Sequence, residues 1–108
     1  MRSNVLPQAP IKGFDEFPPH IWIIHYREAK KYACFEHFGI NGLAAFSDEA
    51  DAEYFACSIA EAHCLTSGLD IRQVTFEEAR IVAKGRPLPI VSLILLDDFN
   101  DPLVHWVK

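Results

Sequence analysis

Two short stretches of this sequence are apolar at nearly every position, and they constrain the fold more than any other feature. They are residues 21–26 (Ile-Trp-Ile-Ile-His-Tyr) and residues 90–96 (Ile-Val-Ser-Leu-Ile-Leu-Leu). β-branched and aromatic residues favour strands, and a strand without polar alternation is typical of a position that is buried on both faces. The sequence therefore predicts a sheet whose central strands are apolar on each side.

Helical patterns lie between these strands. Ser47 or Asp48 can cap a helix whose apolar residues recur at three- and four-residue spacing. Residues 75–78 (Thr-Phe-Glu-Glu) fit the capping box of a second helix, which ends at Gly85. Residues 28–38 fit either a strand or a helix, and the sequence leaves that choice open. The chain thus reads as strands that alternate with two helices and end in a hairpin-like pair.

This order of elements predicts an α+β (mixed α/β) fold, a two-layer sandwich in which two helices cover one face of a mixed four- to five-stranded sheet. Asn41-Gly42 is predicted as a turn within it. Residues 1–19 contain four of the seven prolines and predict an extended N-terminal arm. Residues 20–108 then form a single α/β domain, which is the usual count for a chain of 108 residues.

Composition and charge exclude several classes of function. Ten basic residues against fifteen acidic ones give a formal charge of −5, which disfavours binding to nucleic acid. No apolar run is long enough to span a bilayer, and the N-terminal residues lack the apolar segment of an export signal. The three cysteines are an odd number, so we expect reduced, structural thiols in a cytoplasmic protein.

Two groups of residues are candidates for metal binding. Cys34 and His37 have a Cys-x₂-His spacing, and Asp97, Asp98 and Asp101 form the densest group of oxygen ligands in the chain. The second pair for the first group, His63 and Cys64, is adjacent on a helix, so its side chains point about 100° apart. The aspartates lack the glycine and glutamate of a calcium loop. Buried cysteines, with Cys57 among them, and an Asp-rich turn explain the same residues. We therefore expect neither a metal nor a cofactor.

Nucleophilic catalysis can be drawn for two pairs of residues. A cysteine or serine nucleophile needs a base within hydrogen-bond reach, and Cys34 with His37 or Ser47 with His25 would supply one. No known nucleophile signature accompanies either pair. We assign no catalytic residue, and the sequence leans against an enzyme.

Two helices on one face would leave the other apolar face of the sheet in water. A second subunit could cover that face about a two-fold axis, so we predict a homodimer. The expected interface combines residues of the uncovered face with residues of the arm: Trp22, Ile24, Tyr26, Trp106, Phe14 and Phe17.

Part of the chain resembles a known group of proteins. Residues 43–52 (Leu-Ala-Ala-Phe-Ser-Asp-Glu-Ala-Asp-Ala), with the strand at 21–26, resemble small uncharacterised domains of cyanobacteria and chloroplasts. They are also similar, more distantly, to the N-terminal region of SseB-like proteins, in which a Phe-Thr/Ser-Ser/Asp-Glu turn opens a helix. The resemblance implies a compact α/β module from photosynthetic cells, and it brings no catalytic residues.

These observations favour one function over two others. We predict a non-enzymatic protein-interaction or self-association module that binds neither nucleic acid nor a membrane. A small-ligand or metal-binding regulatory domain is the alternative, and a small enzyme is the least favoured.

Overall fold

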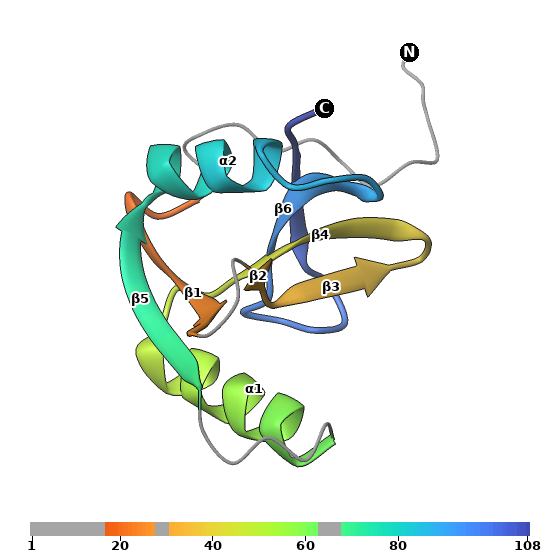
Figure 1. The fold of residues 1–108 in the computed structure, drawn as a ribbon. Coiled ribbons are helices and arrows are strands. Elements are labelled where there is room, and N and C mark those ends of the chain that lie inside the picture. The colour runs from red at the N-terminus through yellow and green to blue at the C-terminus, as the bar shows by residue number, and fades with distance from the viewer. Residues whose placement is uncertain (1–16, 28–30, 63–67) are drawn as a thin grey trace.

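The computed structural model describes residues 17–27, 31–62 and 68–108 (Figure 1). Phe14 of the predicted arm lies outside the described residues, as do His63 and Cys64. In chain order the elements are β1 (His20–Tyr26), β2 (Lys31–Tyr32), β3 (Cys34–His37), β4 (Ile40–Ala45), α1 (Glu49–Ala62), β5 (Leu69–Thr75), α2 (Phe76–Lys84), β6 (Ile90–Leu95) and β7 (Leu103–Trp106). The segment that the sequence left open is therefore a strand over most of residues 31–37.

The strands form two sheets, with orders β2-β1-β5 and β3-β4-β6-β7. β4 and β6 are parallel, whereas the other neighbours within each sheet are antiparallel. The sheets meet at Ala33, between β2 and β3. Its N–H donates to the Ile24 carbonyl (2.9 Å), and its carbonyl accepts from the Ala44 N–H (3.0 Å). A second junction joins Trp22 to Phe46 through two backbone hydrogen bonds of 2.7 and 3.0 Å.

Side chains of the central strands alternate between two hydrophobic cores. On β6, Leu93 and Leu95 enter one core, whereas Ile94 and the following Leu96 enter the other. β1 and β4 divide their side chains in the same way. These four consecutive residues are all buried, so the sheet is covered on both faces, as the continuous apolar pattern predicts.

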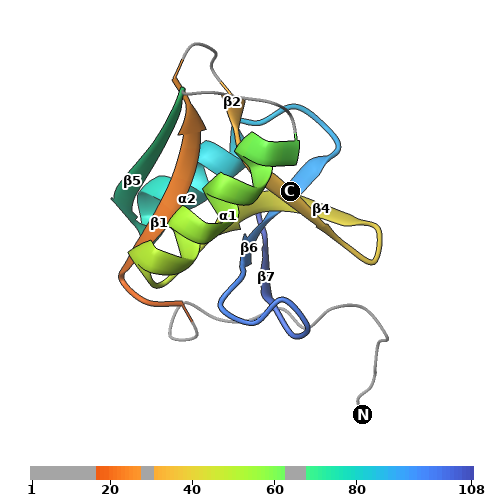
Figure 2. The ribbon, with the colours of Figure 1, turned by 90° about the horizontal axis from the view of Figure 1, so that it is seen from below.

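The two helices cover opposite faces of the strands. Ala79 and Ala83 of α2 pack into the first core, and Ala52 and Ala56 of α1 pack into the second. Figure 1 shows α2 above the strands and α1 below them, and in Figure 2 α1 lies in front of the strands with α2 behind. Small alanine side chains let both helices approach the strands closely.

The α+β class and the packing of two helices against sheet are confirmed, but two details of the prediction differ. The strands divide between two sheets, and the helices do not share a face. The direction of the crossovers gives the reason. β4, β5 and β6 run in the same direction. The chain crosses from β4 to β5 through α1, and it then crosses in the opposite direction, from β5 to β6, through α2. Right-handed crossovers in opposite directions place their helices on opposite faces.

Side-chain caps start both helices where the sequence predicts them. At α2 the Thr75 hydroxyl accepts from the Glu78 N–H (3.0 Å), and the Glu78 carboxylate accepts from the Thr75 N–H (2.8 Å). The predicted capping box is therefore confirmed. At α1 the cap is Asp48, whose carboxylate accepts from the Ala50 N–H (3.0 Å).

The turn predicted at Asn41-Gly42 is wrong, because both residues lie within β4. The hairpin turns instead at Phe38 and Gly39, whose φ angles are +48° and +86°. Two successive positive φ angles are the signature of a type I′ hairpin turn. Gly42 has a packing role: a Cβ there would lie 2.4 Å from Ser92 Oγ and 2.5 Å from Ile94 Cγ1.

Cover on both faces removes the reason for the predicted homodimer. That prediction assumed that one apolar face lacks a helix, and each face has one. Phe17 also adds cover, because it is buried in the first core with its ring 5.1 Å from that of Phe76. The arm thus anchors on the domain at least through Phe17.

Two adjacent substitutions on β6 test this arrangement. Leu93→Ala and Ile94→Ala should each lower the free energy of unfolding by about 2–5 kcal/mol, because each empties a site in a different core. Urea unfolding measures both, and Gln73→Ala, at an exposed position, should change stability by less than about 0.5 kcal/mol. A cost below about 1 kcal/mol for either core variant would mean that one face of the sheet is open to water.

Candidate functional site

The structure does not bring the candidate zinc ligands Cys34 and His37 together. Cys34 and His37 are three residues apart on β3, so their side chains point to opposite faces of the strand. Within residues 17–27, 31–62 and 68–108, no group of three or more histidine, cysteine, aspartate or glutamate side chains is arranged to hold a metal ion.

The aspartates after β6 have structural partners. Asp97 Oδ1 accepts from the Ser47 N–H (2.9 Å), and Asp97 Oδ2 accepts from the Ser47 hydroxyl (2.5 Å). Asp98 Oδ1 accepts from the Asn100 N–H (2.9 Å), and the Asp98 carbonyl accepts from the Asp101 N–H (3.1 Å). Such bonds are typical of an Asp-rich turn, the interpretation that the sequence favoured. They also tie this turn to the start of α1.

The proposed serine–histidine pair does not meet. Because Phe46 pairs with Trp22 in antiparallel register, Ser47 lies level with Ile21. His25 is four residues further along β1, which is about 13 Å at the usual rise of a strand. The Ser47 hydroxyl donates to Asp97 instead, and the His25 ring packs on Tyr32 at 4.9 Å. His25 is therefore out of reach of the Ser47 hydroxyl.

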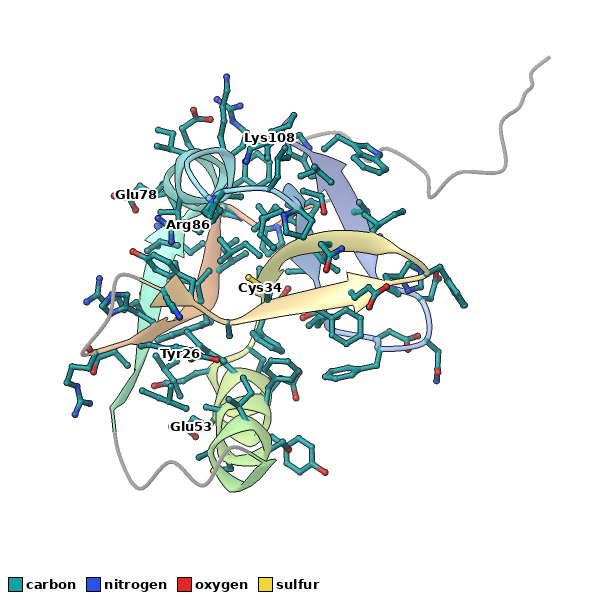
Figure 3. The ribbon with its side chains drawn as sticks, turned by 45° about the vertical axis from the view of Figure 1, so that its right-hand side comes forward. Tyr26, Cys34, Glu53, Glu78, Arg86 and Lys108 are labelled. Atoms are coloured by element: carbon teal, nitrogen blue, oxygen red, sulfur yellow. The ribbon has the colours of Figure 1, made fainter. Side chains whose placement is uncertain are left out.

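Cys34 lies among groups that keep its thiol protonated. Its Sγ donates to the Tyr32 carbonyl (3.4 Å). The residue is exposed overall, but partial burial of its thiol raises the Cys34 pKa, and the Arg86 guanidinium partly offsets this effect. Burial and the neighbouring Cys34 also raise the pKa of Tyr26. Figure 3 shows Cys34 between Tyr26 and Arg86. A nucleophilic cysteine needs a lowered pKa, so these surroundings do not activate Cys34.

Neither described cysteine is buried as the sequence predicted. Cys34 and Cys57 are both exposed as residues. Cys57 follows the buried Ala56, and a helix turns by about 100° per residue, so Cys57 lies outside the inward face of α1.

The described residues among those expected at a dimer interface belong to the chain's own cores. Ile24 and Phe17 are buried, so neither offers surface to a second subunit. Trp22, Tyr26 and Trp106 are half-buried and pack against the core that α1 covers.

Three phenylalanines from separate parts of the chain form a surface that the sequence did not predict. Phe35 of β3, Phe55 of α1 and Phe99 of the β6–β7 turn have ring centroids 5.8–6.5 Å apart. Phe35 and Phe55 are half-buried against the core, while Phe99 is 45 % exposed. The Asp97–Ser47 bonds hold the turn beside α1, and so they position Phe99 against Phe55.

The hairpin tip continues this row of aromatic rings. His37 follows Phe35 on the same face of β3, and the Phe38 ring packs on the His37 ring with centroids 4.6 Å apart. Phe38 is 93 % exposed. We call Phe35, Phe38, Phe55 and Phe99 the aromatic surface.

No signal in the spacing of these residues links them, because they lie 3 to 64 positions apart in the chain. Phe99 is the one that the sequence marks as unusual, since it is an aromatic residue between acidic and amide side chains in a turn. Such turns are normally polar throughout, so an exposed phenylalanine there could have indicated a binding surface.

Comparisons with known proteins add no family. No protein-family model matches the chain, and no curated protein and no solved structure does either. The described helices α1 and α2 are both too short to cross a membrane.

The environment of Cys34 predicts slow alkylation. In a Cys57→Ser, Cys64→Ser background, Cys34 should react with iodoacetamide more slowly in the folded than in the urea-unfolded chain at about pH 8, because the thiolate is the nucleophile. Its pH–rate midpoint should lie higher when folded, and Arg86→Leu should raise it further by removing a cation that favours the thiolate. Faster alkylation of the folded chain would instead mean an activated thiol.

Proposed function

We propose that this chain is a protein-interaction module that binds its partner through the aromatic surface. One observation carries the proposal. Phe35 of β3, Phe55 of α1 and Phe99 of the β6–β7 turn meet in one cluster, and the tip of the same β3–β4 hairpin carries an almost fully exposed Phe38. Aromatic residues are enriched at the centres of protein interfaces, where they supply most of the binding energy.

The conformation of Phe38 strengthens this argument. A type I′ turn favours asparagine, aspartate or glycine at its first central position, because that residue needs a positive φ. A bulky phenylalanine at φ +48° is strained there, and its exposed ring gains little from burial. Strained residues cluster at functional sites, so a role in binding explains this residue better than a role in folding.

The candidate nucleophiles give less support to an enzyme. The Cys34 pKa is raised, and the Ser47 hydroxyl donates to Asp97, which also accepts from the Ser47 N–H, rather than to a histidine. Both features belong to the packing of the chain, whereas the Phe38 ring is almost fully exposed and belongs to neither core.

We propose a different protein, rather than a second copy of this chain, as the partner of the aromatic surface. The structure does not test the homodimer, whose reason was an apolar face without a helix. Because both faces have helices, we expect a monomer near 12.2 kDa in sedimentation at micromolar concentration. A species near twice that mass would restore self-association as the function.

A random-peptide display library selected on the full-length chain tests the interaction module. We expect selected peptides to lose binding by about tenfold or more on Phe99→Ser, because centrally placed aromatic residues dominate binding. Ile81→Ser is the matched control, since Ile81 is an exposed apolar residue on α2, the helix of the opposite face, and it should leave affinity unchanged.

Phe38→Asn separates binding from folding. Asparagine suits the first central position of this turn, so the variant should melt at the same temperature or higher while binding the selected peptides more weakly. If no clone depends on Phe99 or Phe38, the proposed function is wrong.

A further inference from the structure

Exposed carboxylates border the aromatic surface on two sides. The start of α1 supplies some of them and the β6–β7 turn the others: Asp48, Asp51, Asp97, Asp98 and Asp101. We call these five residues the acidic rim. The Ser47–Asp97 hydrogen bonds hold the two segments together, and the Phe55–Phe99 contact places the rings beside them (5.8 Å).

No cation within these segments offsets the charge of the rim. Neither residues 32–71 nor residues 87–107 contain a lysine or arginine, although the whole chain has ten such residues. The ion pairs found among the described residues join Arg27 and Arg72 to Asp70 and Arg80 to Glu77, and none of them involves the rim. The rim therefore carries a local negative charge beside apolar rings.

Helix geometry assigns the charges of α1 to different sides. Asp51 precedes Phe55 by four residues, so both lie on one side of the helix. Glu53 precedes Phe55 by two residues, or about 200° of rotation, and so lies on the far side. Figure 3 shows Glu53 to the left of α1, whereas β3 extends to the right.

We infer that the partner of the aromatic surface is a cationic, amphipathic segment of another protein, rich in lysine or arginine and in apolar side chains. This inference rests on the proposed function and specifies its ligand. Apolar side chains of the segment would cover Phe35, Phe55 and Phe99, as in the apolar centre of an interface. Its lysines or arginines would face the acidic rim, and a cation could also lie over an exposed ring such as that of Phe38.

The same charges disfavour the other occupants. A second copy would place one acidic rim against another, and like charges across an interface are unfavourable. Nucleic acid and anionic lipid surfaces carry the same sign of charge as the rim. The rim is also a poor cation site, because Asp97 and Asp98 already accept hydrogen bonds from their neighbours and the described side chains contain no metal-holding group.

The net charge of the selected display peptides tests the inference. Clones that need Phe99 should be enriched in lysine and arginine together with aromatic or aliphatic residues. Their affinity for the full-length chain, measured by fluorescence anisotropy, should fall as salt rises from about 50 to 300 mM, because salt screens exposed charges.

Charge-neutralising variants then locate the effect. Asp51→Asn and Asp101→Asn should each weaken the cationic peptides by about two- to fivefold, the range of single exposed ion pairs. Glu53→Gln makes the same change of charge on the far side of α1. It should weaken binding by less than half of the fold-change seen with Asp51→Asn. Asp101 lies outside α1, so its variant also separates loss of binding from any loss of helix stability.

The outcomes distinguish the two proposals. Phe99-dependent clones that are neutral or acidic, or whose affinity does not change with salt, would overturn the cationic partner and leave the interaction module standing. Equal effects of Asp51→Asn and Glu53→Gln would also overturn it, because a general charge effect would then explain the binding. A complete lack of clones that depend on Phe99 or Phe38 would overturn the interaction module itself.

Discussion

Burial of neighbouring residues into opposite cores is the constraint on which the rest of this structure depends. The side chains of residues 93–96, at and just after the end of β6, are all apolar and point alternately to the two faces, so neither face can stay in water. A helix on each face meets this requirement, and the outward and returning crossovers through β5 provide it. The alanines of both helices bring their backbones close to the strands, which closes each core with short side chains.

Local interactions made part of this fold predictable from sequence. The Thr75–Glu78 capping box depends on residues three positions apart, and so its pattern is visible without a structure. The side on which each helix packs depends on strand order, which is set by pairings between distant residues such as Trp22 and Phe46. The Asn41-Gly42 prediction failed for a related reason. Asparagine–glycine is a good turn sequence. Gly42 is needed within β4, however, because the side chains of Ser92 and Ile94 on the neighbouring strand occupy the space that a Cβ would fill.

The candidate site was less predictable than the fold, because long-range contacts assemble it. Single residues with reactive side chains, such as Cys34 and the aspartates after β6, drew attention in the sequence, and the structure gives them packing and turn roles. Phenylalanines are ordinary core residues in a sequence, so nothing in Phe35 or Phe55 alone indicates a surface. The uneven distribution of lysine and arginine was visible throughout, and its meaning depended on knowing which segments lie together.

The junction at Ala33 has a consequence for how this small protein loses its structure. One residue gives its N–H to the three-stranded sheet and its carbonyl to the four-stranded sheet. Separating either sheet at this point therefore disturbs the backbone that holds the other. Two sheets and two cores could in principle open as independent units, each with its own free energy. Because Ala33 is shared by both sheets, we expect the two sheets to open together as one cooperative unit rather than one at a time.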